Sequence, residues 1–157
     1  MSSDEIKIIS FLDGLLKNTS VSKLIDLEIV KARKALENSN SSSITETLPL
    51  SVFENKLSKD INLCRLFILK ANLKSKIERH RNSHQRTFTC FGEGDTRILE
   101  NNIWKSNIRK SLGSLIDNRW LSVSENTWHQ PIALLNDWIT ITFHTASESE
   151  IIDEYID

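Results

Sequence analysis

Two stretches near the N-terminus repeat apolar side chains with the period of an α-helix. Residues 3–17 have a broad apolar face. Ser2 and Glu5 at the start of this segment fit a capping box, in which each side chain satisfies a free backbone amide. Residues 21–37 repeat the helical spacing after a polar break at residues 18–20, which offers the next cap. The pattern predicts two helices that can pair as an αα-hairpin.

The pattern changes at residues 38–43, a run of Asn and Ser that has nothing to bury and is typical of a flexible linker. Short segments rich in Ile, Phe, Thr and Trp follow, separated by Asn, Gly, Asp and Ser. The tail from residue 148 to 157 is acidic, which predicts a short helix or a frayed end. Several short strands with regular turn signals predict a sandwich or a barrel. The candidate strands are Leu63–Lys70, Arg86–Phe91, Asp95–Glu100, Trp120–Val123, Pro131–Leu135 and Trp138–His144.

Composition narrows the class of protein. Of 157 residues, 39% are hydrophobic and 26% are charged, which is typical of a globular domain. The formal net charge of -1 argues against a basic field for nucleic acid. Neither a signal peptide nor an apolar run of about 18 residues is found, so we expect a cytoplasmic protein without a membrane segment. Cys64 and Cys90 lie in apolar runs, which predicts buried reduced thiols.

Turn residues and candidate metal ligands are spaced along residues 72–92 in a pattern known from a protein family. They are Asn72, Glu78, His80, Gln85 and Gly92. This spacing resembles the first motif of the cupin superfamily: a Gly, five residues, His-x-His, three or four residues, Glu, six residues and Gly. Asn72 stands at the first Gly and Glu78 at the first His, where one type of metal ligand replaces another. His80 is the second His, and Gln85 replaces the Glu with its isosteric amide.

The second cupin motif is similar to residues 118–133. Asn118, Ser124, Asn126 and His129 stand at its Gly, Pro, Gly and His, and its final Asn falls on Ala133. Together with Asn72 of the first motif, Asn118 and Asn126 thus stand at places where the motifs have Gly. Because Asn is the next-best residue for a positive φ angle, we expect turns with positive φ at all three. The resemblance covers about residues 47–146.

Strand geometry brings the candidate ligands together. Glu78 and His80 are two residues apart, so a strand points both to one face, and His129 would arrive from a later strand. Two His and one carboxylate are typical of non-haem Fe(II), although Ni, Mn or Zn also fit such ligands. We predict Gln85 as a weak fourth ligand or a hydrogen-bond donor to substrate. Arg86 is a second candidate catalytic residue that could hold an anionic substrate, although strand parity points it outward.

Two alternatives stay open. In a shifted register, His80 takes the first His place, Asn82 the second, and Arg86 or Thr87 the Glu place, which leaves no carboxylate. The spacing of the flanking turn residues favours the first register. Glu78 could also be a surface carboxylate paired with a neighbouring basic residue.

Other residues with suitable chemistry have simpler roles. His84 falls in a predicted loop, where solvent exposure is more usual than metal ligation. His144 ends the last predicted strand, which favours a structural role over one in the pocket. Trp128 should point away from the adjacent His129 and serve in packing.

We therefore expect a mainly β protein: a cupin-like jelly-roll β-barrel over residues 46–146, a helical hairpin and linker over 1–45, and an acidic tail over 147–157. The resemblance implies a metal-dependent oxygenase, lyase or isomerase acting on a small oxygen-rich molecule. The alternatives are a barrel that binds a sugar or organic acid without a metal, and an interaction protein that works through its helices. The expected partners are a small-molecule ligand and a second copy in a homodimer, with neither nucleic acid nor membrane.

Overall fold

The computed structural model describes residues 1–113 and 115–157 and begins with two helices. Helix α1 spans Ser3–Leu16 and helix α2 spans Thr19–Glu37. The Ser2 side chain caps α1 by accepting a hydrogen bond from the Glu5 amide, and Asn18 caps α2 in the same way. The two predicted helices are thus confirmed, with ends shifted by at most two residues.

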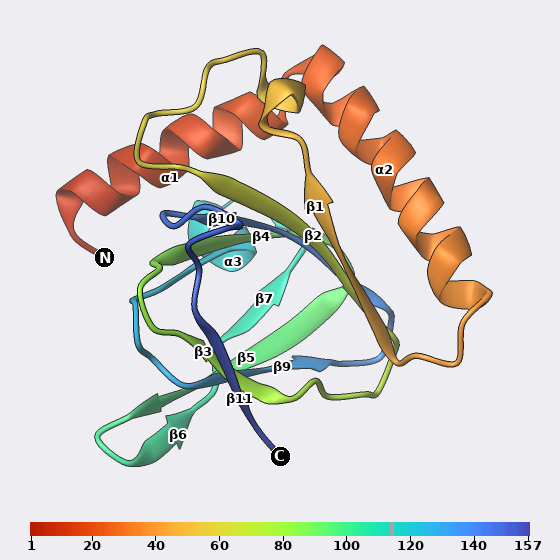
Figure 1. Ribbon diagram of the computed structural model, residues 1–157, viewed down its shortest axis with the longest axis vertical. Helices are drawn as coiled ribbons and strands as arrows, with labels where there is room; N and C mark the ends of the chain where they lie inside the picture. Colours follow the sequence, from red (N-terminus) through yellow and green to blue (C-terminus); the bar gives the residue numbers. More distant parts are fainter. Residues whose placement is uncertain (114) are drawn as a thin grey trace.

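The strands form two antiparallel sheets (Figure 1). One has the order β1-β2-β10-β4-β8, and the other has the order β11-β3-β9-β5-β6, with β7 also on β5. All six predicted strands are present. The strands and short helices are β1 (Ser43–Leu48), η1 (Leu50–Phe53), β2 (Leu63–Leu69), β3 (Ile77–His80), β4 (Gln85–Phe91), β5 (Glu93–Glu100), β6 (Ile103–Lys105), β7 (Ile108–Lys110), α3 (Ile116–Arg119), β8 (Trp120–Val123), β9 (His129–Ala133), β10 (Trp138–His144) and β11 (Asp153–Ile156).

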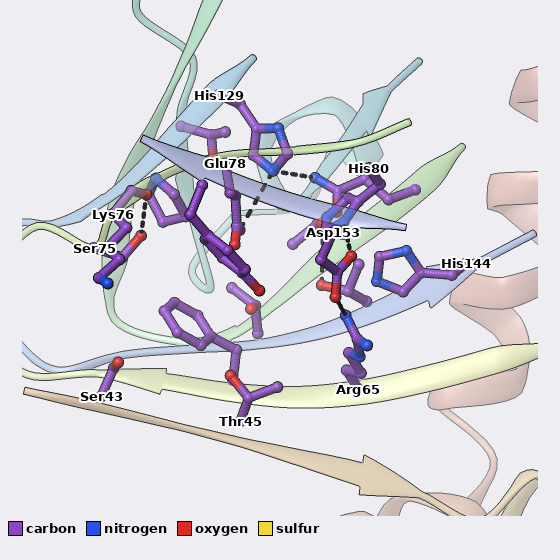
Figure 2. A pocket seen from close by; sticks show the side chains of 18 of the residues that line it. Ser43, Thr45, Arg65, Ser75, Lys76, Glu78, His80, His129, His144 and Asp153 are labelled. Atoms are coloured by element: carbon purple, nitrogen blue, oxygen red, sulfur yellow. Dashed lines mark hydrogen bonds and ion pairs between the residues drawn. The ribbon is translucent and has the colours of Figure 1, made fainter. Parts of the chain in front are cut away.

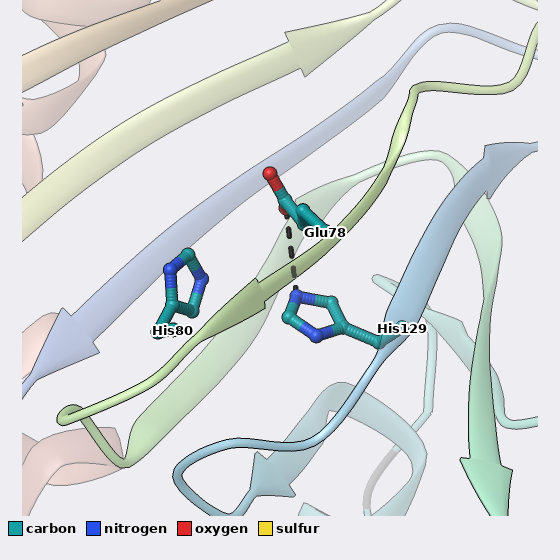
Figure 3. A group of neighbouring side chains, drawn as sticks. All are labelled: Glu78, His80 and His129. Atoms are coloured by element: carbon teal, nitrogen blue, oxygen red, sulfur yellow. Dashed lines mark ion pairs between the residues drawn. The ribbon is translucent and has the colours of Figure 1, made fainter. Parts of the chain in front are cut away.

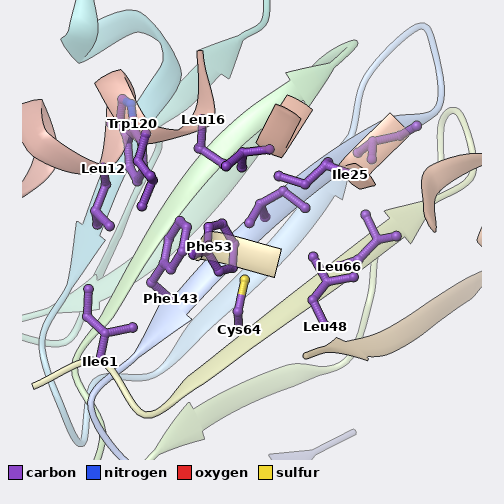
Figure 4. Close-up of a cluster of buried hydrophobic side chains, with 14 of the residues drawn as sticks. Leu12, Leu16, Ile25, Leu48, Phe53, Ile61, Cys64, Leu66, Trp120 and Phe143 are labelled. Carbon is purple, nitrogen blue, oxygen red and sulfur yellow. The ribbon is translucent and has the colours of Figure 1, made fainter. Parts of the chain in front are cut away.

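The helices cover the outer face of the first sheet (Figure 1). On β10, Ile139, Ile141 and Phe143 point to this side and join the main apolar cluster. The cluster continues into α1, α2 and η1, where Phe53 packs against Phe143 with ring centroids 5.3 Å apart (Figure 4). The main hydrophobic core therefore lies between sheet and helices, outside the barrel. This position leaves the barrel interior free for polar side chains.

Ion pairs attach α1 to the sheet beneath it. The Arg86 guanidinium on β4 donates to both oxygens of Glu5, at 2.7 and 2.8 Å. The Arg119 guanidinium and the Trp120 indole N–H both donate to the Asp13 carboxylate. The predicted capping box is therefore half formed: Ser2 caps the helix, but the Glu5 carboxylate binds the sheet because a charged partner lies within reach.

The acidic tail is neither a helix nor a frayed end, and that prediction was wrong. Its residues Asp153–Ile156 form strand β11, which pairs with β3 in an antiparallel register. Asp153 lies opposite His80 in this register and contacts it. The polar run before the barrel is also shorter than predicted, because β1 already begins at Ser43 and pairs with β2. Strand pairing thus extends the barrel at both ends beyond residues 46–146.

The turns test the substitution of Asn for Gly. Asn72 and Asn126 have φ angles of 60° and 59°, and Gly92 has 76°, as the motif comparison predicts. Asn118 does not have the predicted positive φ, because it lies in the short helix α3, where φ is negative.

Both cysteines are free thiols, Cys64 buried and Cys90 partly buried, and burial raises the pKa of Cys90 to about 12. Among the described residues, no helix has the length and apolar character needed to span a membrane.

Candidate metal centre

Strands β3 and β9 bring the three predicted ligands together. Glu78 lies directly opposite His129 in the register of these strands, and His80 follows on the same face of β3 (Figure 3). One ligand atom from each side chain can be chosen so that all three lie within 4.8 Å of one another. His80 and His129 are buried, while Glu78 is partly exposed toward the cavity. The structure thus places Glu78 in the interior and not on the outer surface.

His80 is oriented by a carboxylate from the tail. Its Nδ1 lies 2.6 Å from Oδ1 of Asp153, whose other oxygen accepts a hydrogen bond from Arg65 at 3.1 Å. Burial alone would raise the pKa of Asp153, but the contacts with His80 and Arg65 outweigh it and lower the pKa to about 2. Asp153 is therefore ionised at neutral pH and accepts the Nδ1 proton. This leaves Nε2 of His80 as the nitrogen with a free lone pair.

His129 is held in the same tautomer by a different group. Its Nδ1 lies 3.0 Å from the backbone carbonyl oxygen of Thr127, which can only accept a hydrogen bond. Its Nε2 lies 3.5 Å from Oε1 of Glu78 and 3.0 Å from the side-chain nitrogen of Gln85. Both imidazoles thus carry the proton on Nδ1, where an oxygen accepts it. Fixing Nδ1 in this way is how proteins prepare His for metal ligation through Nε2.

The donor set fits a divalent transition metal. Two imidazole nitrogens and one carboxylate are ligands that Fe(II), Mn, Ni and Zn accept. Burial of both rings and the oxygen acceptors behind them supply the support that such ligands need. Gln85 adds an amide whose oxygen or nitrogen can face the same point, and its side chain is 6% exposed.

Arg86 lies on the other side of the sheet from these ligands. Because it follows Gln85 on β4, the alternation of the strand points it outward, where Glu5 binds it. Its guanidinium does not line the cavity, and the prediction that Arg86 holds a substrate has no support in this geometry. Gln85, by contrast, lines the cavity beside His129, and its role toward a metal or substrate stays a prediction.

The other histidines differ from their predicted roles. His84 is partly buried under α1, where Nε2 lies 2.6 Å from the Ser122 hydroxyl. His144 lines the cavity, with its ring 4.8 Å from that of His80 in an edge-on contact. Burial and the neighbouring His80 and Arg65 lower the pKa of His144 well below its ordinary value. Trp128 points away from the ligands and stacks with Arg79, as strand parity predicts.

The structure supports the first motif register. Asn82, the second ligand of the shifted register, has its side-chain oxygen and nitrogen engaged by the backbone of Ile152 and Glu150. It therefore has no free donor atom for a metal. In the first register, Glu78, His80 and His129 all face one point.

A cavity of about 590 Å³ opens beside the ligands, between the two sheets (Figure 2). Figure 2 shows Ser43 and Thr45 across the cavity from Glu78 and His129. Arg65 and Asp153 lie beside His80 at one end of it. The size suits a small molecule.

Two important residues of the site were missed from the sequence. Asp153 lies in the acidic tail, for which the sequence predicts a short helix or a frayed end, because nothing in residues 148–157 shows that this segment returns to the barrel. Arg65 lies on a predicted strand, and its charge between apolar neighbours was a usable signal for a polar interior. An isolated charge within a buried strand usually has a partner.

Comparisons with known proteins rest on structure alone. No family model matches the sequence, and a search of curated proteins finds no match. Among solved structures, an oxalate oxidase superposes with a TM-score of 0.56 at 9% identity, covering 73% of this chain and 56% of that one. The oxalate decarboxylase of Lactobacillus farciminis gives 0.58 at 7% identity, covering 75% and 32%. A pumpkin 11S globulin gives 0.58 at 13% identity, covering 74% and 29%.

The chain spans little more than half, or less, of the length of these neighbours. They include both enzymes and storage globulins, and all of them have the cupin fold. Their identities to this chain are too low to transfer an activity, so the likeness concerns architecture only. Together with the two antiparallel sheets and the N-terminal helices, it shows that this chain has the cupin fold.

Proposed function

We propose that this protein is a metal-dependent enzyme that acts on a small oxygen-rich molecule inside the barrel. Glu78, His80 and His129 would hold the metal ion. The observation that carries the proposal is the matched orientation of the two imidazoles. Each has Nδ1 bound to an oxygen, which leaves Nε2 as the ring nitrogen available for a metal near the Glu78 carboxylate.

Fe(II) is the favoured metal, because two His and one carboxylate form the ligand set that non-haem iron oxygenases use. Mn, Ni and Zn are the alternatives that the same donors accept. A metal ion at this point supplies a Lewis acid that polarises substrate oxygens, or a centre for dioxygen chemistry. Asp153 keeps the proton of His80 on Nδ1, and the Thr127 carbonyl does the same for His129.

Neighbouring residues shape the space for the substrate. Gln85 presents its amide beside His129, where it can donate a hydrogen bond to a bound oxygen. Phe67, Pro131 and Trp138 contribute apolar surface to the lining. The oxalate oxidase and oxalate decarboxylase among the structural neighbours support chemistry on small acids, as an analogy of fold.

One contact favours a second candidate, a barrel that binds its ligand without a metal. The Gln85 side-chain nitrogen lies 3.0 Å from Nε2 of His129, so an amide hydrogen bond occupies the lone pair that a metal would use. The Gln85 amide would have to turn away, or present its oxygen, when a metal binds. In the alternative, this hydrogen bond is permanent and the site is polar but metal-free.

An anaerobic calorimetric titration with Fe(II) separates the two candidates. We expect the wild-type protein to bind one equivalent and the His129→Ala variant to bind at least about 100-fold more weakly, because one ligand is lost. His84→Ala is the matched control, since His84 lies on the far side of the sheet, and it should bind like wild type. A His129→Gln variant guards against a packing defect, because the side chain is almost fully buried.

Absence of binding in the folded wild-type protein, with Fe(II), Mn(II), Ni(II) and Zn(II) alike, would overturn the metalloenzyme and support the metal-free barrel. If metal binds, an NMR screen of small acids and sugars with the loaded protein tests catalysis. Conversion that disappears in His129→Ala supports the enzyme, whereas binding without conversion supports a metal-dependent binding protein.

A further inference from the structure

We infer that the ligand of the barrel is a polyhydroxylated carboxylate, such as a sugar acid, whose hydroxyl groups are bound by Thr96 and Thr140. The inference rests on the proposed function for the position of the carboxylate, which would lie at the metal. The hydroxyl recognition stands on the cavity wall itself.

Threonine is the commonest residue type on the cavity wall. The strands β1, β4, β5 and β10 all contribute, and the residues are Thr45, Thr47, Thr87, Thr96, Thr140 and Thr142. On the first sheet the opposite face of the same strands is apolar and packs under the helices. Valine would fill the same shape and favour strands equally well, so the fold alone does not require these hydroxyls.

Two of these threonines are buried and have hydroxyls that no described residue binds. Thr96 on β5 is 4% exposed and Thr140 on β10 is 2% exposed. Among the side chains of residues 1–113 and 115–157, only Nε of Arg33 is both sealed from solvent and unpaired, so these two hydroxyls are not sealed orphans. Both threonines line the cavity, whereas Thr87 and Thr142 bind each other at 3.2 Å. The two threonines come from opposite sheets and line one cavity.

Hydroxyls on the wall of a cavity can bind water, and a ligand that displaces this water loses affinity unless it replaces the hydrogen bonds. A ligand with several hydroxyl groups would satisfy both threonines at once, because each hydroxyl both donates and accepts. An alkyl chain in the same place would leave them unsatisfied. The arrangement therefore discriminates against a ligand that lacks hydroxyls.

The charges along the wall favour an anion once a divalent metal is bound. Three basic and three acidic side chains line the cavity, so their formal charges cancel: Arg65, Lys74, Lys76, Glu78, Glu148 and Asp153. A bound divalent metal would leave two positive charges in excess. A carboxylate on the ligand offsets part of this excess and is itself a ligand type that these metals accept. The aromatic faces of Phe67 and Trp138 complete a lining that suits the C–H surface of a sugar ring.

Calorimetry with D-glucuronate under anaerobic conditions tests the inference on the Fe(II)-loaded protein. Hexanoate has the same number of carbons and one carboxylate but no hydroxyl groups, and D-glucose has the hydroxyl groups but no carboxylate. We expect glucuronate to bind at least about tenfold more tightly than either, since a site with unpaired polar groups rejects a ligand that cannot pair them.

Isosteric variants identify the residues. Thr140→Val and Thr96→Val keep the shape of the wall, and each should weaken glucuronate binding about tenfold while leaving hexanoate binding unchanged. Thr140→Ser keeps the hydroxyl and should retain most of the affinity. Thr19→Val is the control, because Thr19 is exposed at the start of α2. Melting curves confirm that each variant is folded.

Equal affinity for hexanoate and glucuronate, or valine variants that bind glucuronate like wild type, would overturn the inference while the metal site stands. The reverse failure is recognised separately. If the protein binds no metal but still binds glucuronate with the threonine dependence, the hydroxyl recognition is supported and the metalloenzyme is overturned.

Discussion

The two faces of strand β10 show how differently one strand can be used. Ile139, Ile141 and Phe143 point outward into the apolar cluster under the helices. The residues between them, Thr140 and Thr142, point into the cavity, as does His144 at the end of the strand. Every residue of the strand is buried, yet one face is apolar and the other is polar.

This contrast teaches that stability and chemistry are separated in the molecule. Apolar burial, the dominant favourable term in folding, is concentrated outside the barrel, where the helices cover the sheet. The interior can then carry His, Glu, Thr and Arg side chains without depriving the fold of its main core. The ion pairs of Glu5 and Asp13 secure α1 on this outer face.

The largest effect should come from an outward residue of β10. Phe143→Ala removes a fully buried ring that packs against Phe53 and Trp120, and we expect a loss of about 3–5 kcal/mol in the free energy of unfolding. Urea unfolding measures the loss. Metal affinity of the folded fraction should stay at the wild-type value. A matching loss of metal affinity would contradict the separation of the two faces.

The second effect belongs to the inner face. Asp153→Asn removes the charge that holds His80 in its ligating tautomer, so metal affinity should fall about 10- to 100-fold, with only a small change in stability. Glu148→Gln is the matched control, because Glu148 also binds Arg65 from the tail but does not contact His80. The tail has no positioning role if both variants bind metal equally well.

The third effect is a pH dependence of the stability that Glu5 contributes on the outer face. Burial alone would raise the pKa of Glu5, but hydrogen bonds from Arg86 and Ser122 lower it from 4.5 to about 2. A lowered pKa in the folded state means that the stabilisation is complete above pH 4.5 and is lost as the pH falls toward about 2.

Glu5→Gln should therefore be less stable than wild type by about 1 kcal/mol at pH 7, a modest value because the pair is partly screened by solvent. The difference should vanish as the pH approaches 2. Chemical denaturation of both proteins across this range measures it. A difference that stays constant with pH would show that the charge of Glu5 plays no part.

The smallest effect concerns the turn where the chain passes from β2 to β3, and so from one sheet to the other. Asn72 has a φ angle of 60°, which Asn and Gly tolerate and Ala does not. Asn72→Ala should cost about 1 kcal/mol, while Asn72→Gly should stay within a few tenths. Equal losses in the two variants would remove the argument that Asn replaces the Gly of the motif.

The fold was largely predictable because β-strands with alternating or buried patterns and helices with caps leave local signals. Trp120–Val123 and Trp138–His144 have the predicted bounds, and Glu78, His80 and His129 converge because strand parity and motif spacing are both local properties. Strand β11 was not predictable in this way. Its partner β3 lies far back in the sequence, and its residues carry charges that are unusual for a strand.

The candidate site was predictable only in its inner shell. The three ligands can be predicted from the motif, whereas the position of Asp153 depends on the pairing of the C-terminal strand β11 with β3. Arg86 shows the opposite case, because parity pointed outward and the structure places it with Glu5. The predicted homodimer stays a prediction, and the helices already have an apolar contact with the sheet of their own chain.

The most direct test of the metal centre is a crystal structure of the protein soaked with Mn(II), with anomalous diffraction recorded on both sides of the manganese absorption edge. We predict one strong anomalous peak bounded by Nε2 of His80, Nε2 of His129 and a carboxylate oxygen of Glu78, and no such peak in His129→Ala. A peak elsewhere, or an empty interior in crystals that hold manganese at the surface, would contradict the account.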